Sequence, residues 1–331
     1  MKQRFEIWDF INERLSGGQA VTMLVVAESN GSSPGRAGYK MAVAQNGELC
    51  GSIGGGVMEV NLVEQCRAAL SKPKPIATEP SAATLIDQTH QKHAPNPSGM
   101  ICSGRQKVIV RNLFAADIVV VKSIIDAMQR NEPIGFEISN LRFQIIENTI
   151  DNFLTYFLKT SEQEFVYQEK LGSANEIIII GGGHCALALS ELMSRLDFRV
   201  RIFDDRPELN TLEKNEFADE VTIIDSYENI GSYLGSSSNA YVAVMTLGYM
   251  SDSVVIKQAI DHEFKYFGVL GSKAKMATLM KELRNEGLSD ERLSRIRTPI
   301  GLPINSQSPE EIAVSIAAEI IAVKNMSEPP A

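Results

Sequence analysis

Residues 176–205 read EIIIIGGGHCALALSELMSRLDFRVRIFDD and contain the pattern on which the fold prediction rests. The apolar run at 177–180 is typical of a buried strand, and the segment after the glycines has the periodicity of a helix. Between them, the spacing Gly181-x-Gly183-x-x-Ala186 matches the pattern G-x-G-x-x-G/A. In that pattern the first glycine permits a tight turn, the second lets the backbone approach a phosphate, and the small third residue keeps helix and strand close.

The start of this helix is suited to an anion, because its peptide N–H groups are exposed and the helix dipole favours negative charge there. Asp204 ends the next strand about 23 residues after Gly181, where an acidic residue accepts a ribose hydroxyl in dinucleotide-binding folds. The sequence therefore predicts a nucleotide-like ligand at Gly181, Gly183, Asp204 and the nearby Arg206. A turn that keeps its glycines only for tight packing would have the same sequence, so that alternative stays open.

Beyond this stretch, short apolar runs alternate with helical segments. The runs lie at 200–203, 221–224, 241–246 and 266–271, and the helical segments lie around 185–195, 208–217, 226–234 and 252–262. Such alternation predicts a parallel sheet covered on both faces. The fold class is therefore α/β, with a Rossmann-like domain at 173–331 after an N-terminal α+β domain at 1–172. The connector at 171–174 is the best boundary between them.

The N-terminal domain contains a second glycine turn. Gly54, Gly55 and Gly56 follow a strand-like segment and precede a helix predicted at 57–70, so their amides also suit an anion. A loop upstream supplies hydroxyl and guanidinium groups, and Lys40, which follows it, is expected to supply further positive charge for a phosphate or another oxyanion. The loop residues proposed to contact an oxyanion are Ser32, Ser33 and Arg36. Turns that merely connect strands would have the same composition.

Other residues at the predicted carboxyl edge of the parallel sheet are weaker candidates. His184 either contacts the ligand or faces solvent at the helix start. Ser272, Lys273 and Lys275 follow the fifth strand, and they either contact a phosphate or form a solvated basic loop. Farther on, Ser308 and Glu311 have the spacing of a capping box at the start of the last helix.

Composition limits the classes of partner. The net charge is −9, no long basic run occurs, and no apolar run approaches the length of a membrane span. Nucleic acid and membranes are therefore not expected partners. Four cysteines without a Cys-x-x-Cys pair indicate a reducing compartment, and the N-terminus lacks a signal-peptide pattern, so a cytoplasmic location is expected.

Several segments together resemble the XdhC/CoxI family, the accessory factors that mature molybdenum hydroxylases such as xanthine dehydrogenase. The segments are GSSPGRAGYKMAV (31–43), GELCGSIGGGVMEVNLVEQC (47–66), GMICSG (99–104), FDDRPE (203–208), FGVLGSKAK (267–275) and PIGLPINSQSPEEIAVSIAAEIIA (299–322). The resemblance covers nearly the whole chain in the order found in the family. The sequence differs from the family pattern at Ser103, where the family usually has glycine, and at 247–249, where it lacks the family's histidines.

The resemblance implies a protein that binds the molybdenum cofactor (molybdopterin), protects it during sulfuration and delivers it to a hydroxylase. A cysteine desulfurase and a molybdenum hydroxylase are the implied partners, and a homodimer is the implied assembly. Cys102 is then the candidate thiolate for molybdenum or sulfur, although a buried structural thiol is the alternative. An NAD(P)-dependent oxidoreductase remains the second hypothesis and a nucleotide-sensing regulator the third.

Overall fold

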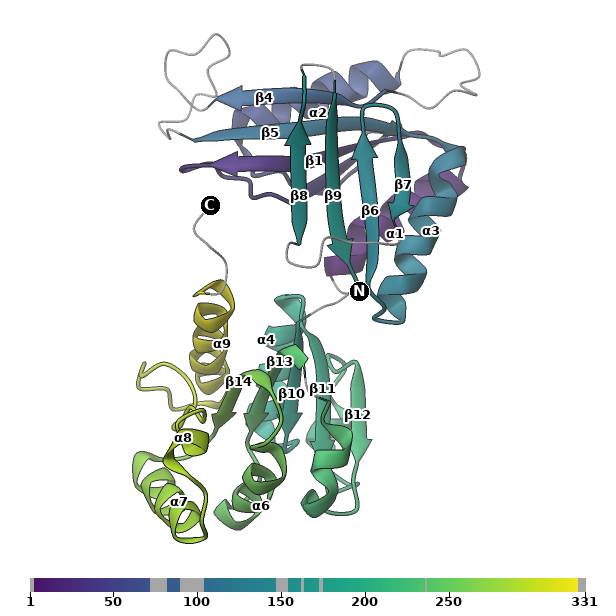
Figure 1. Cartoon of the computed structure of the whole chain (residues 1–331). Coiled ribbons are helices and arrows are strands. Elements are labelled where there is room, and N and C mark those ends of the chain that lie inside the picture. The colour runs from purple at the N-terminus through teal and green to yellow at the C-terminus, as the bar shows by residue number, and fades with distance from the viewer. Residues whose placement is uncertain are drawn as a thin grey trace. The chain divides into compact units, whose positions relative to one another are not determined.

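The structure is a computed structural model that describes residues 3–71, 82–89, 104–146, 154–161, 164–172, 175–235 and 237–326. The described residues form two compact units, one ending at 172 and the other beginning at 175. The first unit contains two antiparallel sheets, and the second contains one parallel sheet (Figure 1). The predicted α/β fold class, with a Rossmann-like C-terminal part, is confirmed.

The first unit places helices on two strand layers. Its elements are α1 (Gln3–Ser16), β1 (Val21–Asn30), β2 (Lys40–Ala44), β3 (Leu49–Gly51), α2 (Gly56–Leu70), β4 (Thr84–Thr89), β5 (Arg105–Leu113), a 3₁₀ turn (Ala115–Asp117), α3 (Ile118–Gln129), β6 (Ile134–Ser139), β7 (Phe143–Ile146), β8 (Thr155–Lys159) and β9 (Phe165–Leu171). One sheet has the order β3-β2-β1-β5-β4 and the other β7-β6-β9-β8. In Figure 1 the strands of the second sheet cross those of the first.

Alternation along β1 divides the first unit into two apolar layers. Met23 and Val25 face the core shared with α1, α3 and the second sheet, where Trp8 meets Phe136 edge-to-face with ring centroids 5.4 Å apart. Leu24 on the opposite face packs beneath α2. Because side chains of a strand alternate between faces, β1 is buried on both sides and serves as the central strand.

The second unit contains five parallel strands. Its elements are β10 (Glu176–Ile180), α4 (His184–Arg195), β11 (Arg199–Asp204), α5 (Asn210–Glu213), β12 (Glu220–Ile223), a 3₁₀ helix (Tyr227–Tyr233), β13 (Ser237–Val244), α6 (Tyr249–Ala259), β14 (Phe264–Val269), α7 (Lys273–Asn285), α8 (Asp290–Leu293) and α9 (Pro309–Met326). The strand order is β12-β11-β10-β13-β14, and every pairing is parallel. This order reverses direction between β10 and β13, which makes their carboxyl ends the topological switch point.

Helices cover both faces of the parallel sheet. The core on one face joins α4 and α9, and the core on the other face joins α6 and α7. The predicted capping box of α9 is confirmed, because the Ser308 hydroxyl and the Glu311 amide lie 3.3 Å apart, as do the Glu311 carboxylate and the Ser308 amide. Each face of the sheet thus presents helix N-termini at the carboxyl edge, where an anion would be attracted.

Two of the predicted helices are not regular α-helices. The segment 208–217 contains only the short α5, because Asn215 turns the chain: its side-chain oxygen accepts hydrogen bonds from the amides of Phe217 and Ala218. The segment 226–234 forms a 3₁₀ helix, which begins where the Ser226 hydroxyl accepts a hydrogen bond from Glu228. In both segments side-chain hydrogen bonds to the backbone compete with α-helical pairing.

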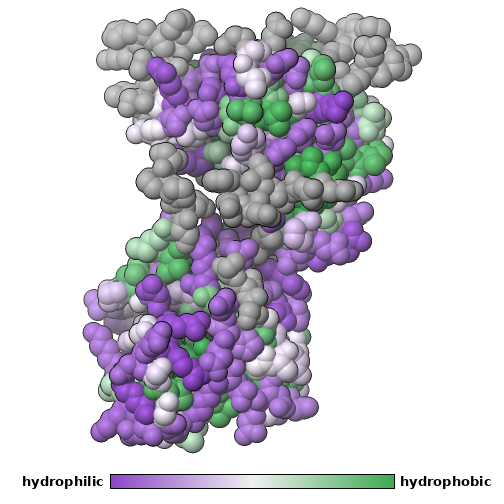
Figure 2. Space-filling model, viewed as in Figure 1, coloured by the Kyte–Doolittle hydropathy of each residue, from purple (hydrophilic) through white to green (hydrophobic). Residues whose placement is uncertain are grey.

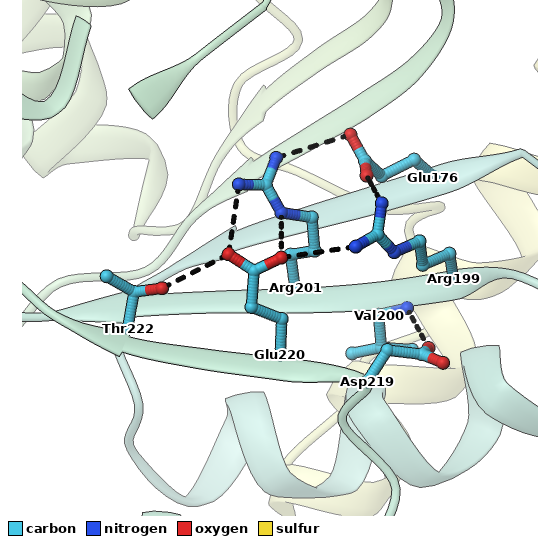
Figure 3. A network of polar contacts seen from close by, with 7 residues as sticks. All are labelled: Glu176, Arg199, Val200, Arg201, Asp219, Glu220 and Thr222. Carbon is cyan, nitrogen blue, oxygen red and sulfur yellow. Dashed lines mark hydrogen bonds and ion pairs between the residues drawn. The ribbon is translucent and has the colours of Figure 1, made fainter. Parts of the chain in front are cut away.

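An ion-pair network crosses β10, β11 and β12 (Figure 3). Arg201 donates to the Glu220 carboxylate at 2.9 Å, and Arg199 bridges Glu220 and Glu176. These residues lie toward the amino ends of the strands, at the edge opposite to the glycine turn. The network therefore contributes to pairing of the edge strand β12 and not to ligand binding.

Glu220→Gln is expected to lower the free energy of unfolding by about 0.5–1 kcal/mol at neutral pH, because the partners are partly exposed and solvent screens them. The hydrogen bond from Arg201 holds the pKa of Glu220 below its ordinary value of 4.5. A carboxylate whose pKa is lowered by folding stabilises the folded state at pH values above its pKa in the unfolded chain. This stabilisation is lost as the pH falls through its pKa in the folded state. Urea denaturation should show the difference at pH 7 and a smaller one at pH 3. Glu263→Gln is the control, and a difference independent of pH would contradict the prediction.

The visible surface of the second unit is mostly hydrophilic, with apolar residues in small separate patches (Figure 2). Among the residues that the structure describes, no helix combines the length and the apolar character needed to cross a membrane. The most exposed large apolar residue described in the second unit is Leu247, with 84% of its surface accessible, and it lies in the segment that follows β13. Apolar exposure in this unit therefore includes a residue at the carboxyl edge of the sheet.

Candidate functional site

The first glycine of the turn after β10 meets the backbone that follows β13. Gly181 has φ +108°, and a Cβ atom there would lie 2.4 Å from the Met245 carbonyl oxygen and 2.9 Å from the Thr246 amide nitrogen. Only glycine accepts both that dihedral angle and that contact. The turn is thereby held against the neighbouring strand at the switch point.

The middle glycine is closed to a ligand. The Gly182 amide donates to the Asp204 carboxylate at 2.6 Å, and its carbonyl oxygen accepts from the Thr211 hydroxyl at 2.5 Å. Leu212 packs against it so closely that a Cβ would lie 2.4 Å from a methyl carbon of that side chain. Gly182 is therefore fixed by protein contacts on both of its peptide groups.

The third glycine lies in open space. Gly183 is the N-cap of α4, with φ −73°, and nothing lies within 4 Å of a Cβ built on it. As glycine, it contributes no side chain to accept from the first-turn amides of α4. A phosphate needs such space and such amides, so Gly183 has the geometry that the predicted contact requires, and the contact itself stays a prediction.

Asp204 occupies the predicted strand end, but its carboxylate is fully buried and already used by the protein. Besides Gly182, it accepts hydrogen bonds from the Arg206 amide at 2.8 Å and from the Arg206 guanidinium at 2.8 and 2.7 Å. Burial alone would raise the pKa of Asp204, but the Arg206 and Gly182 hydrogen bonds lower it below its ordinary value. Asp204 thus holds the turn, and a ribose hydroxyl would have to displace Arg206 to reach it.

His184 is the first residue of α4 and is exposed. Glu310, at the start of α9, is its acidic neighbour: the pKa of Glu310 is lowered by hydrogen bonds at the helix start and by the His184 ring. His184 therefore lies at the candidate site beside an acid, consistent with either of the two roles predicted for it.

A buried carboxylate lies on the other side of the switch point. Asp252, in the first turn of α6, has no exposed surface and accepts from the Thr246 hydroxyl at 2.6 Å and the Lys275 ammonium at 3.1 Å. Thr246 and Asp252 were not among the residues predicted from sequence to form a site. The sequence pattern could have indicated Asp252, because it lies three and four positions before Val255 and Ile256, on the buried and otherwise apolar face of the helix.

The structure separates the three candidates that follow β14. Ser272 is the N-cap of α7, and its hydroxyl accepts from the Lys275 amide at 3.3 Å. Lys273 is exposed at the first helical position, whereas the Lys275 side chain reaches Asp252. Of these residues, Lys275 is the one that the fold directs toward the switch point.

The glycine turn of the first unit is filled by its own helix. The Glu59 carboxylate accepts from the Ser52 hydroxyl at 2.7 Å and from the amides of Ile53 at 2.8 Å and Gly55 at 3.0 Å. A phosphate at Gly54, Gly55 and Gly56 would meet this negative charge. The expectation of a ready anion cradle in the first unit therefore needs correction at Gly55, whose amide already has an internal anion, and the Gly54 amide donates to the Ser52 hydroxyl at 3.1 Å.

The loop before this turn packs closely against β5. The Ser33 hydroxyl donates to Gln106 at 2.7 Å and is buried, and a Cβ on Gly104 would lie 2.3 Å from the Ser33 amide nitrogen. Ser32 is exposed next to it, and Arg36 is an exposed cation 3.5 Å from the Gly31 carbonyl oxygen. The structure thus assigns Ser33 to packing and leaves Ser32 and Arg36 at the surface.

The predicted metal ligand cannot be placed, since Cys102 lies outside the described residues. Within those residues, no group of three His, Cys, Asp or Glu side chains is arranged to hold a metal ion. Lys40, expected to supply charge near the loop, instead forms a buried ion pair with Glu169 at 2.5 Å.

The first unit has a polar pocket that sequence patterns did not predict. Its volume is about 420 Å³, and its walls come from the ends of β1, β4 and β5. Lys107 and Glu28 form an ion pair at 2.8 Å in its lining, and Arg105 is an exposed guanidinium. The sequence gives little indication of this pocket, because its lining residues come from strands that are neighbours in the sheet but distant in sequence.

Comparison with known proteins extends the resemblance noted from the sequence. The family model described as the XdhC Rossmann domain matches residues 177–320, and the model described as the XdhC and CoxI family matches residues 15–79. A crystal structure described as a xanthine dehydrogenase from Bacillus halodurans superimposes with a TM-score of 0.74, covering 99% of this chain and 97% of the other. At 20% identity that likeness concerns the fold.

Two curated proteins are similar in sequence. "Uncharacterized protein YqeB" of Escherichia coli is 22% identical over 305 residues, covering 92% of this chain and 43% of that protein. A Bacillus subtilis protein described as a probable xanthine dehydrogenase subunit is 26% identical over 182 residues, covering 55% of this chain and 52% of that protein. The chain thus spans about half the length of the curated relatives it matches. Its two matched segments occur in the same order as the two units of the fold, and the chain belongs to the XdhC and CoxI family.

Proposed function

We propose that this protein is an accessory factor of a molybdenum hydroxylase of the xanthine dehydrogenase type, and that it binds the molybdenum cofactor. The cofactor's phosphate would lie against the first turn of α4. The observation that carries the proposal is Gly183, which is open on the ligand side while its neighbours Gly181 and Gly182 are packed. A family relation to a protein described as a probable component of xanthine dehydrogenase supports the choice of partner.

In this proposal the protein binds the molybdenum cofactor, protects it during sulfuration and delivers it to the hydroxylase. Molybdopterin carries a phosphate, and a helix N-terminus binds phosphate without needing a side chain of its own. Sulfuration would use a cysteine desulfurase, and insertion would pass the cofactor to the apo-hydroxylase in the cytoplasm. We include a homodimeric assembly and a thiolate role for Cys102 as parts of the proposal that rest on the family resemblance.

The second hypothesis, an NAD(P)-dependent oxidoreductase, has the strand order in its favour, because β12-β11-β10-β13-β14 is the order of dinucleotide-binding folds. The state of Asp204 weighs against it. A free carboxylate at this strand end would recognise ribose hydroxyls, whereas Asp204 has its acceptor positions taken by Gly182 and Arg206.

The test is to purify the protein from a host that makes molybdenum cofactor and from a host that does not. Pterin would be measured by fluorescence after oxidation, and molybdenum by mass spectrometry. We expect pterin to copurify only from the first host, and NAD(H) and NADP(H) to show no binding by calorimetry. Nicotinamide nucleotides that bind tightly to a protein free of pterin would instead establish the second hypothesis.

A further inference from the structure

We propose that Lys275, held in place by the buried carboxylate of Asp252, is a second phosphate contact at the switch point, opposite to the N-terminus of α4. The ligand class is the phosphate or diphosphate of a nucleotide-like cofactor. The inference rests on the proposed function only in placing a phosphorylated ligand on the second unit, and it concerns a residue to which that function gives no role.

The Asp252 carboxylate is buried and needs compensating partners. This carboxylate has no exposed surface, and an uncompensated buried charge is strongly unfavourable. The Thr246 hydroxyl and the Lys275 ammonium compensate it, one on each carboxylate oxygen. The carboxylate thereby fixes the end of a lysine side chain, which would otherwise be among the most mobile groups on the surface.

The Lys275 ammonium is connected to the glycine turn through Asp252 and Thr246. The Thr246 hydroxyl donates to Asp252, and the Thr246 amide lies against Gly181. Since Lys275 donates to the same carboxylate, Asp252 and Thr246 connect the lysine ammonium to the glycine turn. The lysine belongs to α7, which covers the face of the sheet opposite to that covered by α4. A ligand outside the ends of β10 and β13 would therefore be contacted from both faces.

The Lys275 ammonium is accessible to a ligand. An ammonium has three N–H donors, and in the described structure Lys275 donates through its ammonium to Asp252. Its side chain is 34% exposed, so further donors can reach a ligand. The N-termini of α6 and α7 add positive potential around it, while the charge of Asp252 prevents an excess of positive charge when no ligand is bound.

The experiment measures binding of ADP and of inorganic pyrophosphate to the full chain by calorimetry at low and high salt. Removing Lys275 alone would leave a buried unpaired carboxylate and endanger folding, so the main variant is the double substitution Asp252→Asn with Lys275→Met. We expect its dissociation constants to rise about tenfold, as for loss of one charge-assisted contact, with a weaker dependence on salt.

Two further variants separate ligand contact from structural support. Lys275→Arg keeps a cation within reach of Asp252 and should stay within about threefold of the unmodified protein, since arginine also binds phosphate. Lys281→Met removes an exposed lysine farther along α7, away from the helix N-terminus, and should leave binding unchanged. Thermal unfolding of every variant verifies that the second unit is folded.

Equal affinity of the double variant and the unmodified protein would overturn the inference. So would a failure of the unmodified protein to bind either probe. Because the proposed cofactor role is judged separately by pterin copurification, a protein that retains pterin but is insensitive to these substitutions would refute Lys275 alone.

Discussion

Gly183→Ala is expected to weaken retention of the phosphorylated ligand at least tenfold while leaving the stability of the protein nearly unchanged. A methyl group on Gly183 meets no atom within 4 Å, and the φ of −73° suits alanine, so the fold accommodates it. The same methyl would project into the space where a phosphate approaches the α4 amides. The measurements are pterin content of the purified protein and its melting temperature.

Gly181→Ala is the matched variant, and in contrast to Gly183→Ala it is expected to lower the stability of the protein strongly. Its methyl group would clash with the Met245 carbonyl oxygen at 2.4 Å, and alanine rarely adopts a φ of +108°. Overpacking and backbone strain together should cost about 3–5 kcal/mol, or roughly 10 °C in melting temperature for a unit of this size. If Gly183→Ala keeps its full complement of ligand, the phosphate does not lie at α4 and the proposed site is wrong.

Glu169→Leu is expected to destabilise the first unit by about 3–5 kcal/mol, because it leaves the buried Lys40 without its counter-ion. Lys40 and Glu169 are 9% and 8% exposed, and the Tyr167 hydroxyl donates to the same carboxylate at 2.5 Å. Burial and the Glu169 charge raise the pKa of Tyr167 well above its usual value, so the tyrosine remains a neutral donor. Denaturant unfolding, followed by the fluorescence of Trp8 in the same core, measures the loss.

The control is the triple substitution Lys40→Met, Tyr167→Phe and Glu169→Leu, which removes the three polar side chains of the group together. Replacing a complete buried ion pair by apolar residues of similar size is often neutral, so most of the lost stability should return. A triple variant as unstable as Glu169→Leu would show that the cost comes from altered packing and not from an unpaired charge. Because β2 and β9 belong to different sheets, the group joins the two layers of the first unit.

Much of the second unit could be predicted from local sequence. A buried strand, three glycines and an amphipathic helix are contiguous, and their geometry follows from dihedral preferences and side-chain periodicity within a short window. The same reasoning assigned Gly181 to the tight turn, as the structure has it, whereas the phosphate contact predicted at Gly183 stays a prediction. It failed for 208–217, where the Asn215 side chain diverts the backbone from helical pairing.

In contrast, the tertiary structure decided which hydrogen-bond or ion-pair partner each polar side chain has. Asp204 was correctly placed at a strand end, but only the fold shows that the Gly182 amide, 22 positions away, and Arg206 fill its acceptor positions. Lys40 was expected at a ligand, yet its partner Glu169 is 129 positions along the chain. No local pattern shows which distant donor will meet a given acceptor.

The amino-acid sequence by itself thus determined the strand–turn–helix unit and the α/β class, because each depends on neighbours in the chain. The tertiary structure alone decided which charges are already neutralised, at Asp204 and Lys40, and which cation is held at the switch point, at Lys275. The physical reason is that a buried ionisable group must find a partner, and the partner is supplied by the packing of elements far apart in sequence.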